Sequence, residues 1–269
     1  MRRLLLTFAT IVLGVQAAEA RMICTVVADA TSGTILHEQG DCQSRVTPAS
    51  TFKVPLAVMG YDAGFLTNET TPKLPYRKGY ADWGGKNWTQ DTTPERWMKY
   101  SVVWYSQEIA RALGVAKMGA YLSGFDYGNR DLTGDPGKNN GLERSWISSS
   151  LKISPREQLA FMAKLVNRQL PVSRDALDRA IRIVEHAPVD GGWTIHGKTG
   201  SAYPRKADGN FDRTRGWGWY VGWARKGDDV LVFARLDQDE QRHKVTGGLR
   251  ARDAFIKSWP ALARQIGLR

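Results

Sequence analysis

The segments WTIHGKTGSA (193–202), WGWYVGWAR (217–225) and DVLVFARL (229–236) decide the fold. Each contains β-branched or aromatic residues, and polar or glycine-containing connections separate the segments. This pattern is typical of consecutive strands. The C-terminal part of the chain is therefore expected to supply three strands to a sheet.

The beginning of the chain adds a hairpin. Residues 25–29 and 34–37 resemble strands, and a turn around Thr31-Ser32-Gly33 joins them. Cys24 and Cys42 lie symmetrically about Gly33, so cross-strand pairing would bring their sulfur atoms together in an oxidising compartment. The two residues are therefore expected to form a disulfide, with two free buried thiols as the alternative.

Helical signals fill the chain between the hairpin and these strands, and one more follows the last strand. Helices are expected from Thr51 to Met59, from Pro94 with Gly114 as a stop, from the capping box at Ser154 onward, from Arg174 to His186, and from Arg250 to Gln265. The expected fold class is α+β, or α/β, with an antiparallel sheet formed from the N- and C-terminal segments and flanked by helices. A mostly helical subdomain is expected as an insertion at roughly 63–185.

The first residues resemble a processing signal. A basic start at Met1-Arg2-Arg3 precedes an apolar run to Val15, and Ala18-Glu19-Ala20 fits a small-x-small cleavage site. We expect a secretory signal peptide over 1–20, followed by a single catalytic domain over 21–269; a buried N-terminal core helix is the alternative. The mature protein is then periplasmic or secreted, without membrane insertion.

Composition excludes several classes of protein. The 269 residues are 42% hydrophobic and 24% charged, which is typical of a globular chain. The net charge of +11 raises the question of nucleic acid, but the basic residues are scattered and form no recognition motif. We expect a solvated basic surface with some attraction for anionic envelope polymers, and no nucleic-acid partner. The sequence does not indicate an oligomeric state.

Two segments have a serine followed three residues later by a lysine. On a helix this spacing puts the hydroxyl and the amine on one face, where the lysine can take the serine proton. Ser50 and Lys53 open an apolar helix that can hold both side chains rigidly. Ser149 and Lys152 lie in a serine-rich approach to the helix cap at Ser154. Ser50 is therefore the better candidate for a nucleophile.

Three further motifs follow in order along the chain: Ser101-Val102-Val103, Tyr127-Gly128-Asn129 and Lys198-Thr199-Gly200. With the PASTFK run at 48–53 and the GWGWYVGW strand at 216–223, the chain resembles the penicillin-recognising serine acyltransferases, and specifically the class D (oxacillinase-type) β-lactamases. The resemblance spans nearly all of the chain after the signal. It implies a β-lactamase/transpeptidase-like fold and the hydrolysis of small-molecule β-lactam antibiotics, a cause of antibiotic resistance.

The resemblance also assigns roles to residues. It implies catalytic roles for Ser50, Lys53, Ser101 and Lys198, an oxyanion hole from the backbone N–H groups of Ser50 and Ser201, and substrate binding by Thr199, Gly200 and Arg250. Arg252 competes with Arg250 for the role of binding the substrate carboxylate. The Tyr127-Gly128-Asn129 motif favours a tight turn, so a structural role and a direct one both remain open.

Lys53 presents a chemical difficulty, because a lysine with an ordinary pKa is protonated at neutral pH and cannot accept the Ser50 proton. Phe52, Val103, Trp146 and Leu151 are candidates to dry its pocket, and desolvation lowers the pKa of a lysine. A neutral amine can add CO₂ to form a carbamate, which can act as general base for acylation and deacylation. No other cofactor is expected. No metal is expected either, because the four histidines lack ligand spacing.

Three functions fit these residues to different degrees. The leading hypothesis is an exported enzyme that hydrolyses β-lactams. A penicillin-binding peptidase, or the sensor domain of a β-lactam receptor, would acylate without fast turnover. A non-enzymatic envelope-binding protein would have no need of intact Ser50, Lys53 and Lys198. The sequence does not select among penicillins, cephalosporins and carbapenems.

Overall fold

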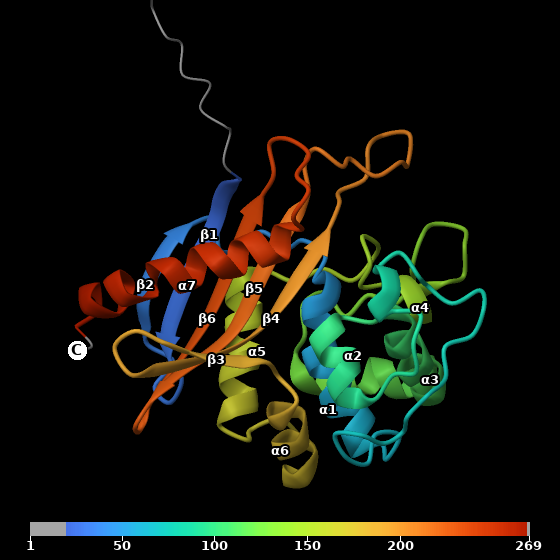
Figure 1. Ribbon diagram of the computed structural model, residues 1–269, viewed down its shortest axis with the longest axis horizontal. Helices are drawn as coiled ribbons and strands as arrows, with labels where there is room; N and C mark the ends of the chain where they lie inside the picture. Colours follow the sequence, from blue (N-terminus) through green and yellow to red (C-terminus); the bar gives the residue numbers. More distant parts are fainter. Residues whose placement is uncertain (1–19, 268–269) are drawn as a thin grey trace, which may run out of the picture.

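A computed structural model describes residues 20–267 of the chain. Within that range six strands form one antiparallel sheet in the order β2-β1-β6-β5-β4-β3 (Figure 1). The first strands in the chain pair with the last ones, so the sheet is built from both ends, as predicted. The proposed signal peptide lies outside the described residues, apart from Ala20.

The N-terminal hairpin consists of β1 (Arg21–Asp29) and β2 (Ile35–Gly40). Its turn is held by the Asp29 carboxylate, which accepts hydrogen bonds from the backbone N–H groups of Thr31 and Ser32, and Gly33 adopts a φ of 71°. Cys24 on β1 and Cys42 just beyond β2 form a disulfide with their Cα atoms 5.1 Å apart. The outer edge of the sheet is thus tied to the strand beside it.

The C-terminal strands agree with the predicted segments to within two residues. They are β4 (Trp193–Ala202), β5 (Trp217–Lys226) and β6 (Asp229–Gln238). One edge strand, β3 (His186–Val189), lies where the sequence predicted the end of a helix. The helix α6 (Arg174–Arg182) ends earlier than expected, because the chain after Ile183 pairs with β4 instead.

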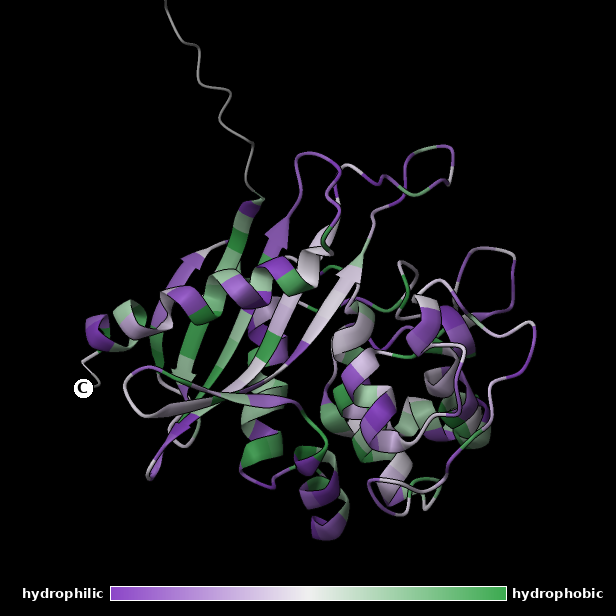
Figure 2. Ribbon diagram, viewed as in Figure 1, coloured by the Kyte–Doolittle hydropathy of each residue, from purple (hydrophilic) through white to green (hydrophobic). Residues whose placement is uncertain are grey.

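Helices cover both faces of the sheet, which accounts for the apolar character of its strands (Figure 2). On β6, Phe233 packs toward α7 (Gly247–Gln265), while its neighbours Val232 and Ala234 join the larger core on the opposite face. This alternation is the two-residue period of a strand. The helix α5 (Pro155–Val166) covers that opposite face and begins at the predicted capping box of Ser154 and Glu157.

The remaining helices form a lobe beside β4 (Figure 1). They are the short 3₁₀ turn η1 (Ala49–Phe52), α1 (Lys53–Asp62), η2 (Gly85–Asn87), α2 (Pro94–Tyr100), α3 (Val103–Phe125) and α4 (Gly141–Arg144). One continuous helix from Pro94 to a stop at Gly114 was expected. The chain leaves the helix earlier, at Ser101, which has a left-handed φ of 57°. Gly114 (φ 72°, ψ 164°) interrupts the helical backbone, as predicted, and a second helical stretch follows it within α3.

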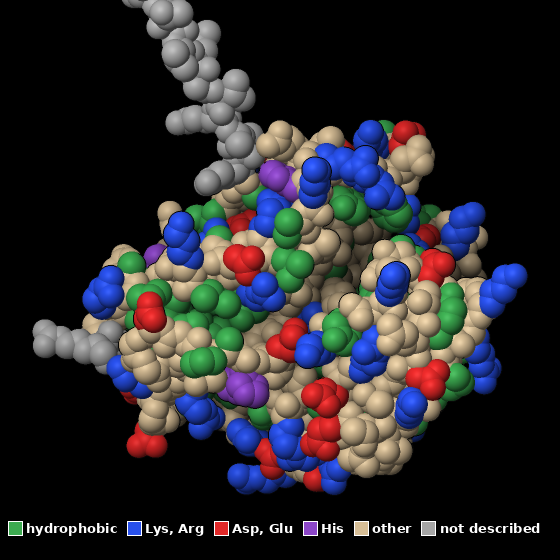
Figure 3. Space-filling view, in the orientation of Figure 1, with side chains coloured by type: hydrophobic (Ala, Val, Ile, Leu, Met, Phe, Trp, Pro, Cys, Tyr) green, Lys and Arg blue, Asp and Glu red, His purple; other side chains and the backbone are tan. Residues whose placement is uncertain are grey.

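None of the helices in residues 20–267 combines the length and the apolar character needed to cross a membrane. The surface is hollowed between the sheet and the helical lobe, and Lys and Arg side chains gather along one rim of the hollow (Figure 3). The end of β4 and the start of α1 meet in this region (Figure 1). The candidate motifs therefore converge where the two parts of the molecule meet.

Candidate active site

Ser50 lies in the 3₁₀ turn that leads directly into α1. The residue before it, Ala49, adopts a φ of 51°, which is strained for a residue with a Cβ atom. The Ala49 N–H donates to the carbonyl of Trp146, and the Thr51 N–H donates to the carbonyl of Pro48. These bonds hold the turn that presents Ser50.

Lys53 is the first residue of α1 and is 1% exposed. Its Nζ lies 3.4 Å from the Oγ of Ser50, so the serine and lysine share one face of the helix start. Burial, with a smaller effect from the positive charge of Lys198, holds the pKa of Lys53 well below its ordinary value. The neutral amine is therefore accessible at a much lower pH than in water.

The four residues that were predicted to dry the Lys53 pocket are all buried. Phe52 stacks on Trp146 with ring centroids 5.2 Å apart. Val103, at the start of α3, is 6% exposed, and Leu151 is fully buried. Trp146 supports the turn that contains Ser50 in two ways, since its ring packs on Phe52 while its carbonyl accepts the Ala49 N–H.

Ser101 and Lys198 form a second pair of serine and lysine side chains in contact. Lys198 Nζ donates to Ser101 Oγ at 2.7 Å and to the Thr199 carbonyl at 3.0 Å. Burial is the main cause that lowers the pKa of Lys198 to about 8; nearby Arg252 lowers it further, while Glu185 opposes the shift. The break between α2 and α3 turns Ser101 toward Lys198 on β4.

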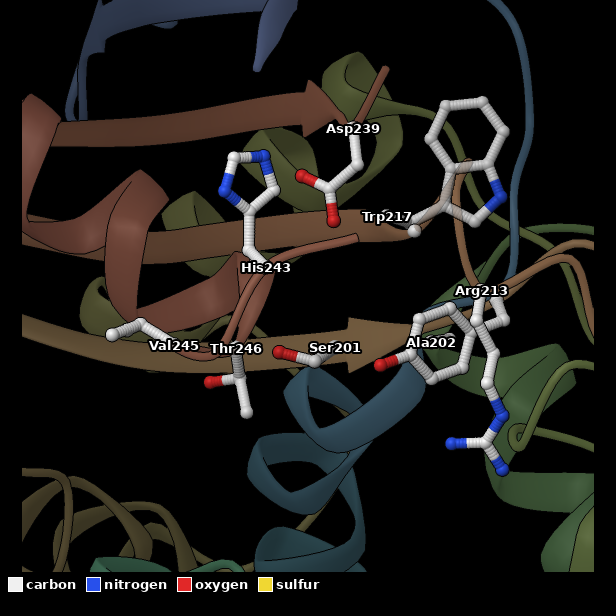
Figure 4. Close-up of a pocket in the computed structure, with 11 residues that line it drawn as sticks. Ser201, Ala202, Arg213, Trp217, Asp239, His243, Val245 and Thr246 are labelled. Carbon is white, nitrogen blue, oxygen red and sulfur yellow. The ribbon is translucent and has the colours of Figure 1, made fainter. Parts of the chain in front are cut away.

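Gly200 brings β4 directly against the turn that holds Ser50. A Cβ atom there would lie 2.9 Å from the Pro48 carbonyl oxygen and 3.0 Å from the Thr51 methyl group. Ser201 follows, and its Oγ accepts a hydrogen bond of 2.8 Å from the N–H of Gly248 at the start of α7. Figure 4 shows Ser201 on β4, above the beginning of the helix that carries Lys53.

Arg250 is close to the end of β4 but is already engaged by the protein. It forms an ion pair with Asp239, and its Nε donates to the Val245 carbonyl at 3.2 Å. Asp239 lines a small pocket together with Ser201 and His243 (Figure 4). Arg252 instead pairs with its neighbour Asp253.

The Tyr127-Gly128-Asn129 motif makes structural contacts. The Asn129 side chain donates to the Ser150 carbonyl at 2.8 Å and accepts from the Lys152 N–H at 2.9 Å. Gly128 has a φ of 55° and leaves room for the Lys152 carbonyl. The motif thus anchors the loop that leads from Trp146 toward the helix cap at Ser154.

Two residues that sequence reasoning missed complete the surroundings of Ser50. Thr51 donates its hydroxyl to the Pro48 carbonyl, and Gln158 on α5 donates its side-chain amide to the Thr51 hydroxyl at 2.7 Å. Gln158 is a fully buried polar residue on the inner face of an amphipathic helix. That mismatch between a polar side chain and an apolar face was the available signal.

Comparison with known proteins identifies the class to which this fold and site belong. Residues 23–258 match the family model for the penicillin-binding protein transpeptidase domain, and the chain belongs to that family. It is 41% identical over 239 residues to β-lactamase OXA-9 of Klebsiella pneumoniae, covering 89% of this chain and 87% of the relative. It is 36% identical over 242 residues to β-lactamase OXA-1 of Escherichia coli, covering 87% and 82%.

A solved structure narrows the assignment from the transpeptidase-domain family to one class of β-lactamases. The crystal structure of the class D β-lactamase OXA-427 superposes with a TM-score of 0.84 at 48% identity, covering 90% of this chain and 99% of that one. Together with the OXA relatives, this similarity shows that the chain is a class D serine β-lactamase. The resemblance inferred from the four motifs is confirmed.

Proposed function

We propose that the enzyme hydrolyses β-lactam antibiotics through an acyl-enzyme on Ser50. The observation that carries the proposal is the buried Lys53 amine, 3.4 Å from the Ser50 hydroxyl. Ser50 Oγ attacks the lactam carbonyl, the ring C–N bond breaks, and the acyl group stays on the serine as an ester. Water then cleaves the ester and releases the opened product.

The developing oxyanion needs donors on the substrate side of the turn. The backbone N–H groups of Ser50 and Ser201 supply them in this proposal. Gly200 supports the assignment, because its close packing on Pro48 and Thr51 brings the strand with Ser201 beside the turn with Ser50. Fixed donors of this kind act strongly in a site that excludes water.

Lys53 is proposed to be carboxylated by CO₂. Two observations support this proposal, because the amine is buried and its pKa is depressed. The indole N–H of Trp146, whose ring stacks on Phe52, is proposed to donate to the carbamate. The carbamate would supply a general base for both half-reactions. Val103 and Phe52 exclude water from the amine and so favour the uncharged lysine that CO₂ requires.

Ser101 is proposed to pass a proton to the departing lactam nitrogen. Its Oγ accepts a hydrogen bond from Lys198, which leaves the serine O–H free to donate to the substrate. Lys198 also places a positive charge next to Thr199 and Gly200. These residues, with Arg250 as the preferred arginine, are proposed to bind the substrate carboxylate.

We further propose that the enzyme acts outside the cytoplasm, in the periplasm or as a secreted protein, after removal of residues 1–20. The basic start, the apolar run and the Ala18-Glu19-Ala20 site support this proposal. N-terminal sequencing of the exported enzyme should begin at Arg21. An exported protein that retains Met1 would contradict it.

Turnover of nitrocefin by the purified enzyme tests the proposal. Many turnovers per molecule are expected, at a rate that does not decay as the acyl-enzyme forms. A stoichiometric burst without turnover would indicate a peptidase-like or sensor-like acylation. The absence of any reaction would indicate a binding protein on the same scaffold.

A further inference from the structure

A chain of buried hydrogen bonds lies beneath the nucleophile's turn and takes no part in the chemistry described above. Tyr127, Gln158 and Thr51 are each fully buried. The Gln158 amide nitrogen lies 2.7 Å from Thr51 Oγ1, and Thr51 Oγ1 lies 2.7 Å from the Pro48 carbonyl oxygen. The hydroxyl of Tyr127 approaches the Gln158 carbonyl at 3.5 Å. The chain links α5, on the far face of the sheet, to the residue that follows Ser50.

The hydrogen bonds run in one direction. A threonine hydroxyl has a single proton, and Thr51 gives it to the Pro48 carbonyl. Its oxygen must then accept from another group, and the Gln158 amide is that donor. The Pro48 carbonyl also accepts the Thr51 backbone N–H at 3.2 Å, so this one oxygen accepts two hydrogen bonds from Thr51 across the turn. Gln158 thereby fixes the rotamer of Thr51 and, through it, the shape of the turn.

Thr51 is also one of the groups on which β4 rests. The position of Gly200 is limited by the Pro48 carbonyl and by the Thr51 methyl group. Gly200 precedes Ser201 on the strand, while Thr51 follows Ser50 in the turn. The nearest of these groups is the Pro48 carbonyl, which the Thr51 hydroxyl holds, so we expect that hydroxyl to influence how far the backbone N–H of Ser201 lies from that of Ser50.

We propose that Gln158 is a positioning residue that acts through the Thr51 hydroxyl to set the separation of the two oxyanion-binding N–H groups. The inference rests on the proposed function, because it assigns those two groups to the oxyanion hole. Gln158 does not touch the substrate. It holds Thr51, Thr51 holds the Pro48 carbonyl, and the strand with Ser201 packs on both.

Two substitutions at Thr51 separate the hydroxyl from the methyl group. Thr51→Val removes the hydroxyl at nearly constant volume, whereas Thr51→Ser keeps the hydroxyl and removes the methyl group that faces Gly200. Acylation by a fluorescent penicillin, measured by rapid quench, should slow about 10- to 100-fold in Thr51→Val and less than about threefold in Thr51→Ser. Gln158→Leu should slow acylation as much as Thr51→Val. The double variant should be no slower than either single variant, because both act through one bond.

One control variant and two further measurements distinguish a positioning role of the Thr51 hydroxyl from a contribution to stability alone. Tyr121→Phe is the control variant: it removes a hydroxyl that donates to the Asp62 carboxylate at 2.8 Å, in a part of the molecule away from the turn. This variant should lose stability but should acylate at the wild-type rate. In Thr51→Val, a phosphonate transition-state analogue should bind more weakly by the same factor as acylation slows. The ¹³C carbamate signal of Lys53 should persist, because the lysine pocket is unchanged.

The inference is overturned if folded Thr51→Val acylates within threefold of the wild type, or if Thr51→Ser loses as much as Thr51→Val. Thr51→Val decides the matter even if Gln158→Leu fails to fold. Wild-type enzyme that is acylated but does not turn over nitrocefin would contradict the proposed hydrolysis. The ratios of acylation rates would still test the inference in that case.

Discussion

The same four-residue pattern occurs twice in this enzyme with different results. Ser50 and Lys53 lie at the start of α1, where the amine is 1% exposed and 3.4 Å from the hydroxyl. Ser149 and Lys152 lie in an irregular segment, and Lys152 is exposed to solvent. A spacing of three residues brings side chains onto one face of a helix, and burial lowers the pKa of the lysine. The pattern therefore predicts chemistry only when its context supplies both.

The second segment has its own explanation. Its backbone at Ser150 and Lys152 is held by the Asn129 side chain, and Ser150 Oγ donates to the Asp131 carbonyl. The loop in turn begins at Trp146, whose carbonyl supports Ala49. One serine-lysine pair is thus proposed to perform the reaction, while the other belongs to the wall that supports it.

The largest effect is expected from substitution of Ser50, the proposed nucleophile. Ser50→Ala should reduce kcat/KM by about 10³-fold or more, because the proposed reaction runs through an acyl-enzyme on the Ser50 hydroxyl. Mass spectrometry after penicillin treatment should show no acyl adduct on this variant. Ser149→Ala is the matched control and should keep wild-type activity within about threefold. An adduct on the peptide that contains Ser149 would reverse the comparison.

Changing the polarity of the lysine pocket should have the next largest effect. Val103→Asp puts an anion beside Lys53, which favours the ammonium form and opposes carboxylation. We expect kcat to fall about 10²-fold and added bicarbonate to restore little of it. Val115→Asp controls for a new charge on the same helix, since Val115 is 56% exposed. An equal loss of kcat in Val103→Asp and Val115→Asp would show that the polarity of the Lys53 pocket does not matter for the reaction.

Trp146→Ala removes the indole but keeps the backbone carbonyl that supports Ala49. A hydrogen bond to a charged group contributes roughly 1.5–3 kcal/mol, so deacylation should slow about 10- to 100-fold and acylation less. Rapid-quench mass spectrometry should then find the acyl-enzyme accumulating at steady state. An equal slowing of both steps would assign Trp146 to packing alone.

The pair of Lys198 and Ser101 should make kcat/KM depend on pH. The pKa of Lys198 is lowered to about 8, so its charged form predominates below that pH and is lost above it. Because the cation is proposed to hold Ser101 and the substrate carboxylate, kcat/KM should fall by up to about tenfold per pH unit above 8. Lys152→Ala should leave this profile unchanged. A profile that stays flat to pH 10 would exclude the charge of Lys198 from catalysis.

The smallest effect on activity is expected at the disulfide, which lies at the β2 edge of the sheet. Closing a loop with a sequence separation of 18 residues should stabilise the fold by about 3 kcal/mol. Cys24→Ser/Cys42→Ser should therefore melt at a lower temperature and keep kcat within about twofold. Thiol titration of the denatured, unreduced wild type should find no free thiol. Two free thiols would contradict the pairing.

Features with a local physical cause could be predicted from the sequence. Segments with β-branched and aromatic residues, separated by polar or glycine-containing connections, located β4, β5 and β6, and the capping box of Ser154 and Glu157 located the start of α5. The ordered motifs named Ser50, Lys53, Ser101 and Lys198, and the structure brings each of these serines within hydrogen-bonding distance of one of the lysines. Features that depend on distant contacts were missed. Ser101 leaves the helix although no glycine or proline marks the break, and β3 exists because β4 offers an unpaired edge.

Gln158 shows the same limit within the site. Its position in α5 was predicted, but its partner Thr51 is more than a hundred residues away in the sequence. Only the fold brings the two together. The motifs accordingly predicted the two serine-lysine pairs, whereas the groups that hold Ser50 in place required the structure.

The central claim is that burial converts Lys53 into a carboxylated base, and ¹³C NMR of the enzyme under ¹³CO₂ tests it most directly. The account predicts a carbamate resonance in the wild type that is absent from Lys53→Ala. Activity should fall on degassing at mildly acidic pH and return with bicarbonate. A fully active wild type with no carbamate resonance and no bicarbonate response would contradict the claim, while leaving Ser50 as the nucleophile.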